Sequence, residues 1–131
     1  MEVTFKKGIP GFEYLRKFRI EDVNNSKDYK IIRSLEEDIS FSAVLPFNIY
    51  NEYEIDLTEE IVKELEIKHP TDVLVLNIIT LGKTLEESTV NLKAPVIINV
   101  SNNMAKQFII QCDTYDTKHL LIRRNQNVSN Y

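Results

Sequence analysis

The side chains that most often perform chemistry are scarce in this sequence. It holds one cysteine, Cys112, and two histidines, His69 and His119, and neither histidine lies at metal-ligand spacing from acidic residues. Functional histidines normally have an orienting partner, and His69, which precedes Pro70, is instead interpreted as a helix-end residue stabilised by the helix dipole. Cys112 ends an apolar run and is interpreted as a small core residue or a half-buried one. We therefore predict no catalytic residue, no metal site and no cofactor.

Carboxylates are the only chemically capable groups present in number. Ten acidic residues and one base, Lys63, lie between Glu36 and Glu66, which gives this window a net charge of −9 within a chain of net charge −4. The plainest interpretation is a solvated acidic face. The window can also steer a basic partner protein, or supply the opposed pair of carboxylates that a small hydrolase needs. The overall acidity disfavours direct binding to nucleic acid.

Several motifs that would indicate other functions are missing from the sequence. It contains no glycine-rich phosphate loop and no Gly-x-Ser-x-Gly elbow. A single cysteine allows no intramolecular disulfide and fits a reducing cytoplasm. The first residues lack the pattern of a signal peptide, and no apolar run approaches the roughly 20 residues that a membrane helix requires. The sequence therefore predicts a cytoplasmic protein with no membrane partner.

The segment 88–100 organises the predicted fold. Pro95 fixes its own φ and lacks a backbone N–H, so it is tolerated at the first residue of a strand. The β-branched run 96–98, with Val100 beyond it, predicts a strand that is covered on both faces. Seven further runs predict strands in the rest of the chain, the last of them as a strand or a short helix. They are residues 2–6, 18–21, 29–34, 39–45, 73–81, 105–112 and 120–122.

One helix is predicted, with a cap at Asp56 or Thr58 and an end at His69 and Pro70. Aspartate and threonine side chains accept hydrogen bonds from the first N–H groups of a helix. Apolar residues recur every four positions from Leu57, which makes a stripe on one helix face. Because a helix of about ten residues is marginal alone, it must pack against the sheet.

Together these elements predict an all-β, mainly antiparallel, small β-barrel-like domain with one short α-helix, because strands are many and do not alternate with helices. The domain spans residues 1–124, and a flexible tail follows at 125–131. Glycines flanking a proline in the segment 8–11 predict a turn with positive φ. Asparagines that interrupt apolar runs are predicted to satisfy backbone groups at strand ends or bulges. They are Asn77, Asn91 and Asn99.

With chemistry scarce, binding of other proteins becomes the default prediction. The stretch 47–66 is both aromatic and acidic. Tyrosine-rich surfaces suit interfaces because each ring buries much area at low entropic cost and keeps a polar tip. The alternative is that these aromatic side chains only cover one end of the barrel.

Short pieces of the sequence, spread in order over residues 4–122, resemble the flagellar assembly factor FliW family. They are Gly8-Ile9-Pro10-Gly11-Phe12, Pro46-Phe47 followed by Tyr53-Glu54, Asn91-Leu92-Lys93-Ala94-Pro95-Val96, Met104-Ala105-Lys106-Gln107, and Tyr115. The sequence departs from the family at its start, where members usually carry another strand's worth of residues before Thr4. A missing strand would leave a barrel seam open, and an open edge can pair with a partner or a second copy.

The resemblance implies a cytoplasmic, non-enzymatic protein that binds flagellin before export. When free of flagellin, such a protein binds the translational repressor CsrA and antagonises it, by an effect described as allosteric. The protein would be a monomer, or an oligomer if a barrel edge is open. An alternative is a structural scaffold of the flagellar export system. The residues expected to contact partners are Phe47, Tyr53, Glu54, Asn91, Lys93 and Lys106.

Overall fold

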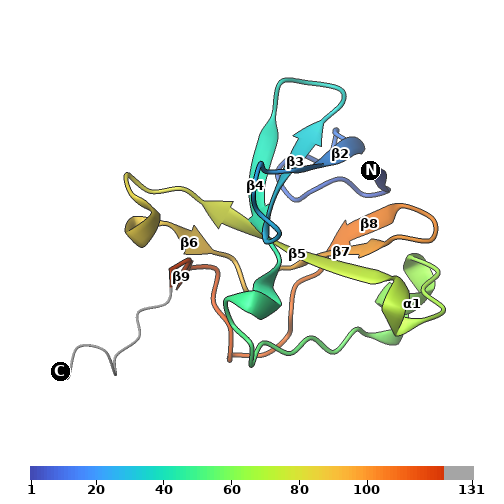
Figure 1. Cartoon of the computed structure of the whole chain (residues 1–131). Helices are drawn as coiled ribbons and strands as arrows, with labels where there is room; N and C mark the ends of the chain where they lie inside the picture. Colours follow the sequence, from blue (N-terminus) through green and yellow to red (C-terminus); the bar gives the residue numbers. More distant parts are fainter. Residues whose placement is uncertain (123–131) are drawn as a thin grey trace.

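The computed structural model describes residues 1–122 and is built mainly of strands (Figure 1). The nine strands are β1 (Glu2–Phe5), β2 (Lys17–Asp22), β3 (Tyr29–Ser34), β4 (Ser40–Val44), β5 (Val73–Thr80), β6 (Thr89–Val90), β7 (Val96–Asn99), β8 (Met104–Gln107) and β9 (His119–Leu120). One α-helix, α1 (Glu59–Glu64), and three 3₁₀ helices, η1 (Pro46–Asn48), η2 (Pro70–Asp72) and η3 (Leu85–Glu87), complete the elements. The predicted all-β class is confirmed, and the predicted tail at 125–131 lies outside the described residues.

Seven of the strands close into a barrel. Their order is β4-β3-β2-β1-β8-β7-β5, and β4 also pairs with β5. Every ladder is antiparallel except the one between β1 and β8, in which Thr4 pairs with Met104 and Phe5 with Ala105. Contrary to the expectation of an open seam, β1 is paired on both sides. Strands β6 and β9 add a small extension to the far end of β5.

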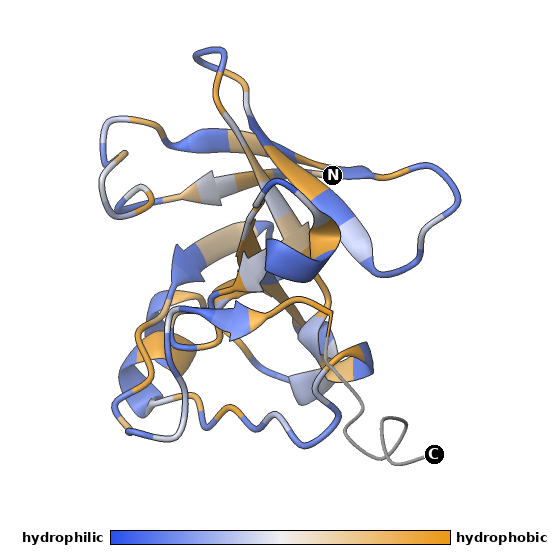
Figure 2. Cartoon of the chain, turned by 90° about the vertical axis from the view of Figure 1, so that its left-hand side faces the viewer, coloured by the Kyte–Doolittle hydropathy of each residue, from blue (hydrophilic) through white to orange (hydrophobic). Residues whose placement is uncertain are grey.

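Strand β7 lies between two apolar layers. All four of its residues are buried, which confirms the prediction of a strand covered on both faces. Val96 and Ile98 face the barrel interior, whereas Ile97 packs in a second cluster beneath α1 with Ile61 and Leu65. Alternate residues of a strand point to opposite faces, so the unbroken apolar run supplies both layers. Figure 2 shows how hydrophobic and hydrophilic residues alternate along the chain.

The predicted helix is wrong at its C-terminal end. Helix α1 begins as expected, because the Thr58 hydroxyl oxygen accepts a hydrogen bond from the N–H of Ile61 at 3.2 Å. It ends at Glu64, where Glu66 takes a φ of 54° and the N–H of Ile67 donates to the carbonyl oxygen of Val62. A left-handed residue of this kind terminates a helix. His69 therefore lies beyond the helix and does not interact with its dipole.

The strand predicted at 105–112 is also shorter than expected. Strand β8 ends at Gln107, opposite Val96 at the start of β7. The residue just before β7 is Pro95, which has no N–H to donate to the ladder. Pro95 accepts a hydrogen bond from the N–H of Phe108 and Lys93 accepts one from Ile110, but no strand continues beyond Gln107. Near the other end of the barrel, η1 forms part of what was expected to be an extended connection after β4.

The three interrupting asparagines bond to backbone groups as predicted, but Asn77 lies inside β5 and not at a strand end. The Asn77 side-chain amide donates to the carbonyl oxygen of Asn91 at 2.8 Å, and the Asn91 side-chain oxygen accepts from the N–H groups of Lys93 and Ala94. Asn99 joins β7 to the end of α1, as described below. These contacts hold the segment that precedes β7 in place. The predicted turn with positive φ is confirmed at Gly8 and Gly11.

Candidate partner-binding surface

Four of the six expected contact residues are engaged in holding the fold. Tyr53 is 3% exposed, and its hydroxyl donates to the carbonyl oxygen of Leu92 at 2.6 Å. Burial raises the pKa of the Tyr53 hydroxyl to about 12, so it stays protonated as a donor. The side-chain oxygen of Asn91 caps the following turn, and the Lys93 ammonium donates to the carbonyl oxygen of Cys112. Lys106 forms an ion pair with Glu64. Their role in partner contacts stays a prediction.

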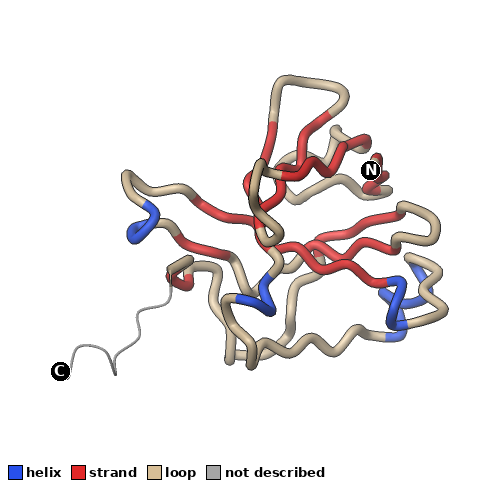
Figure 3. The backbone as a smooth tube through the Cα atoms, in the orientation of Figure 1, coloured by secondary structure: helices blue, strands red, loops and turns tan. Residues whose placement is uncertain are grey.

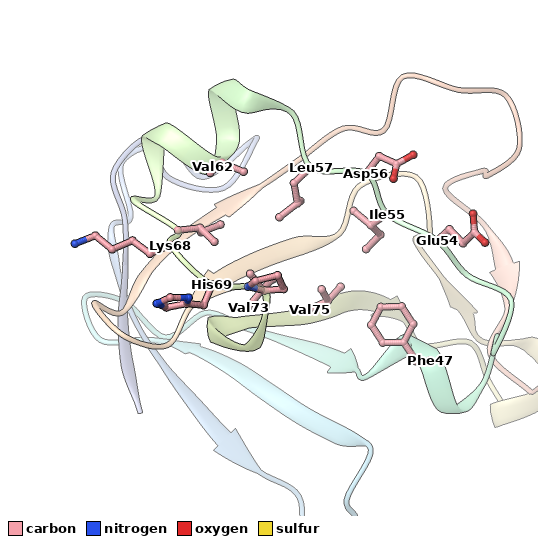
Figure 4. Close-up of a pocket in the computed structure, with 12 residues that line it drawn as sticks. Phe47, Glu54, Ile55, Asp56, Leu57, Val62, Lys68, His69, Val73 and Val75 are labelled. Atoms are coloured by element: carbon pink, nitrogen blue, oxygen red, sulfur yellow. The ribbon is translucent and has the colours of Figure 1, made fainter.

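The other two expected residues, Phe47 and Glu54, line one groove. Its volume is about 760 Å³. Its walls come from η1, the extended segment 54–57, α1, the segment 67–70 and the start of β5 (Figure 4). Most lining side chains are apolar, as is typical of sites that bind an apolar surface. They are Phe47, Ile55, Leu57, Val62, Ile67, Pro70, Val73 and Val75.

Charged and polar groups of opposite character stand at the two ends of this groove. Glu54 and Asp56 lie at one end, and Lys68 and His69 lie at the other (Figure 4). Both carboxylates are exposed and come from the same wall, two residues apart. They are therefore not opposed across the groove as the catalytic pair of a glycoside hydrolase would be. A groove with an apolar floor and polar ends instead selects the orientation of a bound polypeptide.

Sequence reasoning missed the basic end of the groove and its floor on β5. Lys68 and His69 were placed in the helix, whereas they lie in the connection between α1 and η2. One signal could have found the acidic wall. Residues 54–57 read Glu-Ile-Asp-Leu, and this alternation predicts an extended segment with two apolar side chains inward and two carboxylates outward. Ile55 and Leu57 are indeed half-buried, and Glu54 and Asp56 are exposed.

Helix α1, one wall of the groove, is attached to the barrel by an ion-pair cluster. The Glu64 carboxylate accepts from Lys106 on β8 at 2.8 Å and from Lys7 in the β1–β2 connection at 2.9 Å. The hydrogen bond from Lys106, and then the one from Lys7, hold the pKa of Glu64 below its ordinary value. One carboxylate of the acidic window, that of Glu64, is therefore paired with lysines of the same molecule.

We expect Glu64→Gln to lower the free energy of unfolding by about 1 kcal/mol at neutral pH. The neutral glutamine can no longer form the partly exposed ion pairs with Lys106 and Lys7. Because the pKa of Glu64 is lowered in the folded protein, its ionised form contributes its full stabilisation above the ordinary value of 4.5. This stabilisation is lost as the pH falls through the folded-state pKa. The variant should therefore lose less stability than the parent on acidification below pH 4.5. Urea unfolding at a series of pH values measures this, with exposed Glu59→Gln as control. Parallel pH profiles for parent and Glu64→Gln would contradict it.

Residues 1–122 offer neither a metal cluster nor a membrane-spanning helix. No group of three or more histidine, cysteine, aspartate or glutamate side chains in this range is placed to hold a metal ion. Within the same range, no helix is long and apolar enough to cross a membrane.

Comparison with known proteins shows what the chain is similar to. Residues 1–121 match the family model described as "FliW protein". The flagellar assembly factor FliW of Clostridioides difficile strain 630 is 51% identical over 124 residues, covering 94% of this chain and 95% of that protein. The same factor from Clostridium botulinum strain Okra is 44% identical over 122 residues, covering 92% and 85%. A crystal structure of the flagellar assembly factor FliW superposes with a TM-score of 0.88 at 32% identity, covering 94% of this chain and 86% of that one.

Proposed function

This chain belongs to the FliW family of flagellar assembly factors, and from that membership we propose that it binds flagellin before export. We propose further that, once flagellin has left, the freed protein binds the translational repressor CsrA in the cytoplasm and antagonises it. The protein acts by binding alone, without transforming a small molecule. It couples the amount of unexported flagellin to the activity of the repressor.

The observation that carries this proposal is the apolar groove that Phe47 and Glu54 share. A subunit awaiting assembly exposes apolar surface that its polymer will later bury. A groove of about 760 Å³ with an apolar floor can cover such a surface. Its acidic and basic ends fix which way the bound segment runs. We therefore assign the groove to flagellin.

The acidic window between Glu36 and Glu66 supports the proposal that CsrA is the second partner. The Glu36 carboxylate accepts from the backbone N–H groups of Arg16 and Lys17, and Glu64 is paired as described. Glu54 and Asp56 form no ion pair with any residue between 1 and 122, and both are exposed. A repressor that binds RNA needs a basic surface. Unpaired carboxylates at the groove end suit such a partner and increase its association rate.

Isothermal titration of the purified protein with flagellin and with CsrA tests the proposal. We expect Phe47→Ala to weaken flagellin binding about tenfold, because truncating a half-exposed aromatic anchor removes apolar contact at the centre of an interface. Leu81→Ala is the matched control, since Leu81 is 62% exposed and lies beyond the opposite end of β5. A parent protein that binds neither partner at concentrations on the order of 10 µM would end the proposal.

A further inference from the structure

A second hollow lies on the other side of the wall that carries Glu54 and Asp56. We name it the slot; its volume is about 390 Å³. One side is the segment 54–58, and the other is the segment 108–112 that follows β8; neither belongs to a helix or a strand. Figure 3 shows both segments as loops outside the barrel strands. The side chains that line the slot are Glu54, Asp56, Thr58, Phe108, Ile110, Gln111, Cys112, Thr114 and Tyr115.

The segment 108–112 has one paired edge and one unpaired edge. The N–H groups of Phe108 and Ile110 each donate at 2.8 Å, to the carbonyl oxygens of Pro95 and Lys93. Successive N–H groups of an extended chain point to opposite edges. The N–H groups of Ile109 and Gln111 therefore point away from Lys93 and Pro95, and neither has a partner among residues 1–122. Gln111, whose N–H is on the unpaired edge, is among the residues that line the slot.

The facing segment is equally short of backbone partners. The N–H of Glu54 donates to the Tyr115 hydroxyl at 3.0 Å, and the carbonyl oxygen of Thr58 accepts from Val62 in α1. Between these two contacts, no backbone group of residues 55–57 is hydrogen-bonded to a described residue. The slot is thus bordered by two extended stretches that do not pair with each other. Edges of this kind accept an added strand from another chain.

The charges on the slot indicate which kind of strand it takes. Glu54 and Asp56 are two residues apart, and in Figure 4 both carboxylates point away from Val73 and Val75, whereas Ile55 points toward them. A strand that lies along the slot presents alternate side chains to one face. Basic side chains at alternate positions would meet both carboxylates. Acidic ones would be repelled.

We propose that the slot accepts an extended segment of a partner protein as an added β-strand on residues 108–112, with basic side chains at alternate positions facing Glu54 and Asp56. The inference rests on the proposed function for the partner, which is the basic repressor CsrA. Flagellin occupies the groove and the repressor occupies the slot. The assignment predicts main-chain hydrogen bonds from Ile109 and Gln111 to the repressor.

Amide hydrogen exchange followed by nuclear magnetic resonance tests the main-chain contacts without any substitution. Adding CsrA to the full chain should slow exchange at Ile109 and Gln111 at least tenfold. The amide of Ile110, already bonded to Lys93, should change far less. Unchanged exchange at Ile109 and Gln111 in a saturated complex would overturn the inference and leave CsrA binding itself intact. Slowed exchange with flagellin and not with CsrA would overturn the assignment of the occupant.

Two pairs of variants test the same contacts by affinity. Gln111→Pro removes the outward N–H and should weaken CsrA binding about tenfold, whereas Gln111→Ala keeps it and should bind within about twofold of the parent. The double variant Glu54→Lys with Asp56→Lys should bind CsrA at least tenfold more weakly than the parent. Glu86→Lys with Glu87→Lys makes the same charge change on η3 and should lose little.

The outcomes separate the two proposals. A parent chain that fails to bind CsrA overturns the proposed function. Loss of binding in both double variants alike shows general charge attraction only and overturns the slot. If Gln111→Pro melts at a lower temperature than the parent, the exchange measurement on the unmodified chain decides. Equal binding by well-folded Gln111→Pro and Gln111→Ala excludes strand addition.

Discussion

Replacing Gly8 with alanine is expected to lower the free energy of unfolding by about 3 kcal/mol or more, a severe effect for one methyl group. Gly8 has a φ of 70°, a conformation that costs an L-residue about 1 kcal/mol. A Cβ at this position would also lie 2.5 Å from the Cα of Glu13 and 2.6 Å from its carbonyl oxygen. Both are backbone atoms, so no side-chain rotation relieves the overlap and the turn must move.

Gly11, three residues further on, is the matched control. Its φ is 88°, but a Cβ built there meets no atom within 4 Å. Gly11→Ala should therefore lower the free energy of unfolding only by the cost of the positive φ, about 1 kcal/mol. Urea unfolding of both variants, followed by far-ultraviolet circular dichroism, measures the difference. Equal destabilisation would show that the approach of Glu13 to Gly8 does not matter.

Replacing Asn99 with alanine is expected to cost about 3 kcal/mol of stability, because a fully buried side chain with four hydrogen bonds is lost. Its amide donates to the carbonyl oxygens of Leu65 at 2.8 Å and Glu66 at 3.1 Å, at the end of α1. Its oxygen accepts from the N–H and the hydroxyl of Ser101. The variant removes all four hydrogen bonds at once and leaves a cavity where the side chain was fully buried, and both losses destabilise the fold.

Asn102→Ala is the control for this second substitution. Asn102 also donates to the carbonyl oxygen of Leu65, at 3.0 Å, but its side chain is exposed, so water can replace it. We expect this control to cost less than 1 kcal/mol. Thermal unfolding of both variants checks the ranking. A cost for Asn102→Ala equal to that for Asn99→Ala would contradict the argument from burial.

The sequence predicted the strands better than it predicted their ends. The β-branched residues of β7 favour a strand, because their stiffness and shape suit a pleated sheet. The end of α1 depends on Glu66 in a left-handed conformation, and glutamate carries no signal for it. Pro95 correctly predicted where β7 begins. Its second effect, ending the ladder with β8, follows only once those two strands are known to be neighbours.

The residues of the candidate surface were likewise predicted only in part. Phe47 and Glu54 were predicted as contacts and do line the groove, because an exposed aromatic residue and an acidic one suit an interface in any arrangement. Tyr53 has the same composition signal, yet it is buried and bonded to Leu92. Counting charges along the chain also overestimated the acidic surface. Glu64 belongs to the window by sequence but is neutralised by Lys106 from a distant strand.

The parallel ladder between β1 and β8 has a consequence for biosynthesis. Strand β1 pairs with Met104 and Ala105, which are synthesised long after it. Until then β1 has only β2 as a neighbour, and its other edge stays unprotected. Contacts so far apart in sequence slow folding and prolong the time in which a nascent chain can aggregate. Closure of the barrel therefore waits until β8 has been synthesised, and chaperones have their longest opportunity to act on β1.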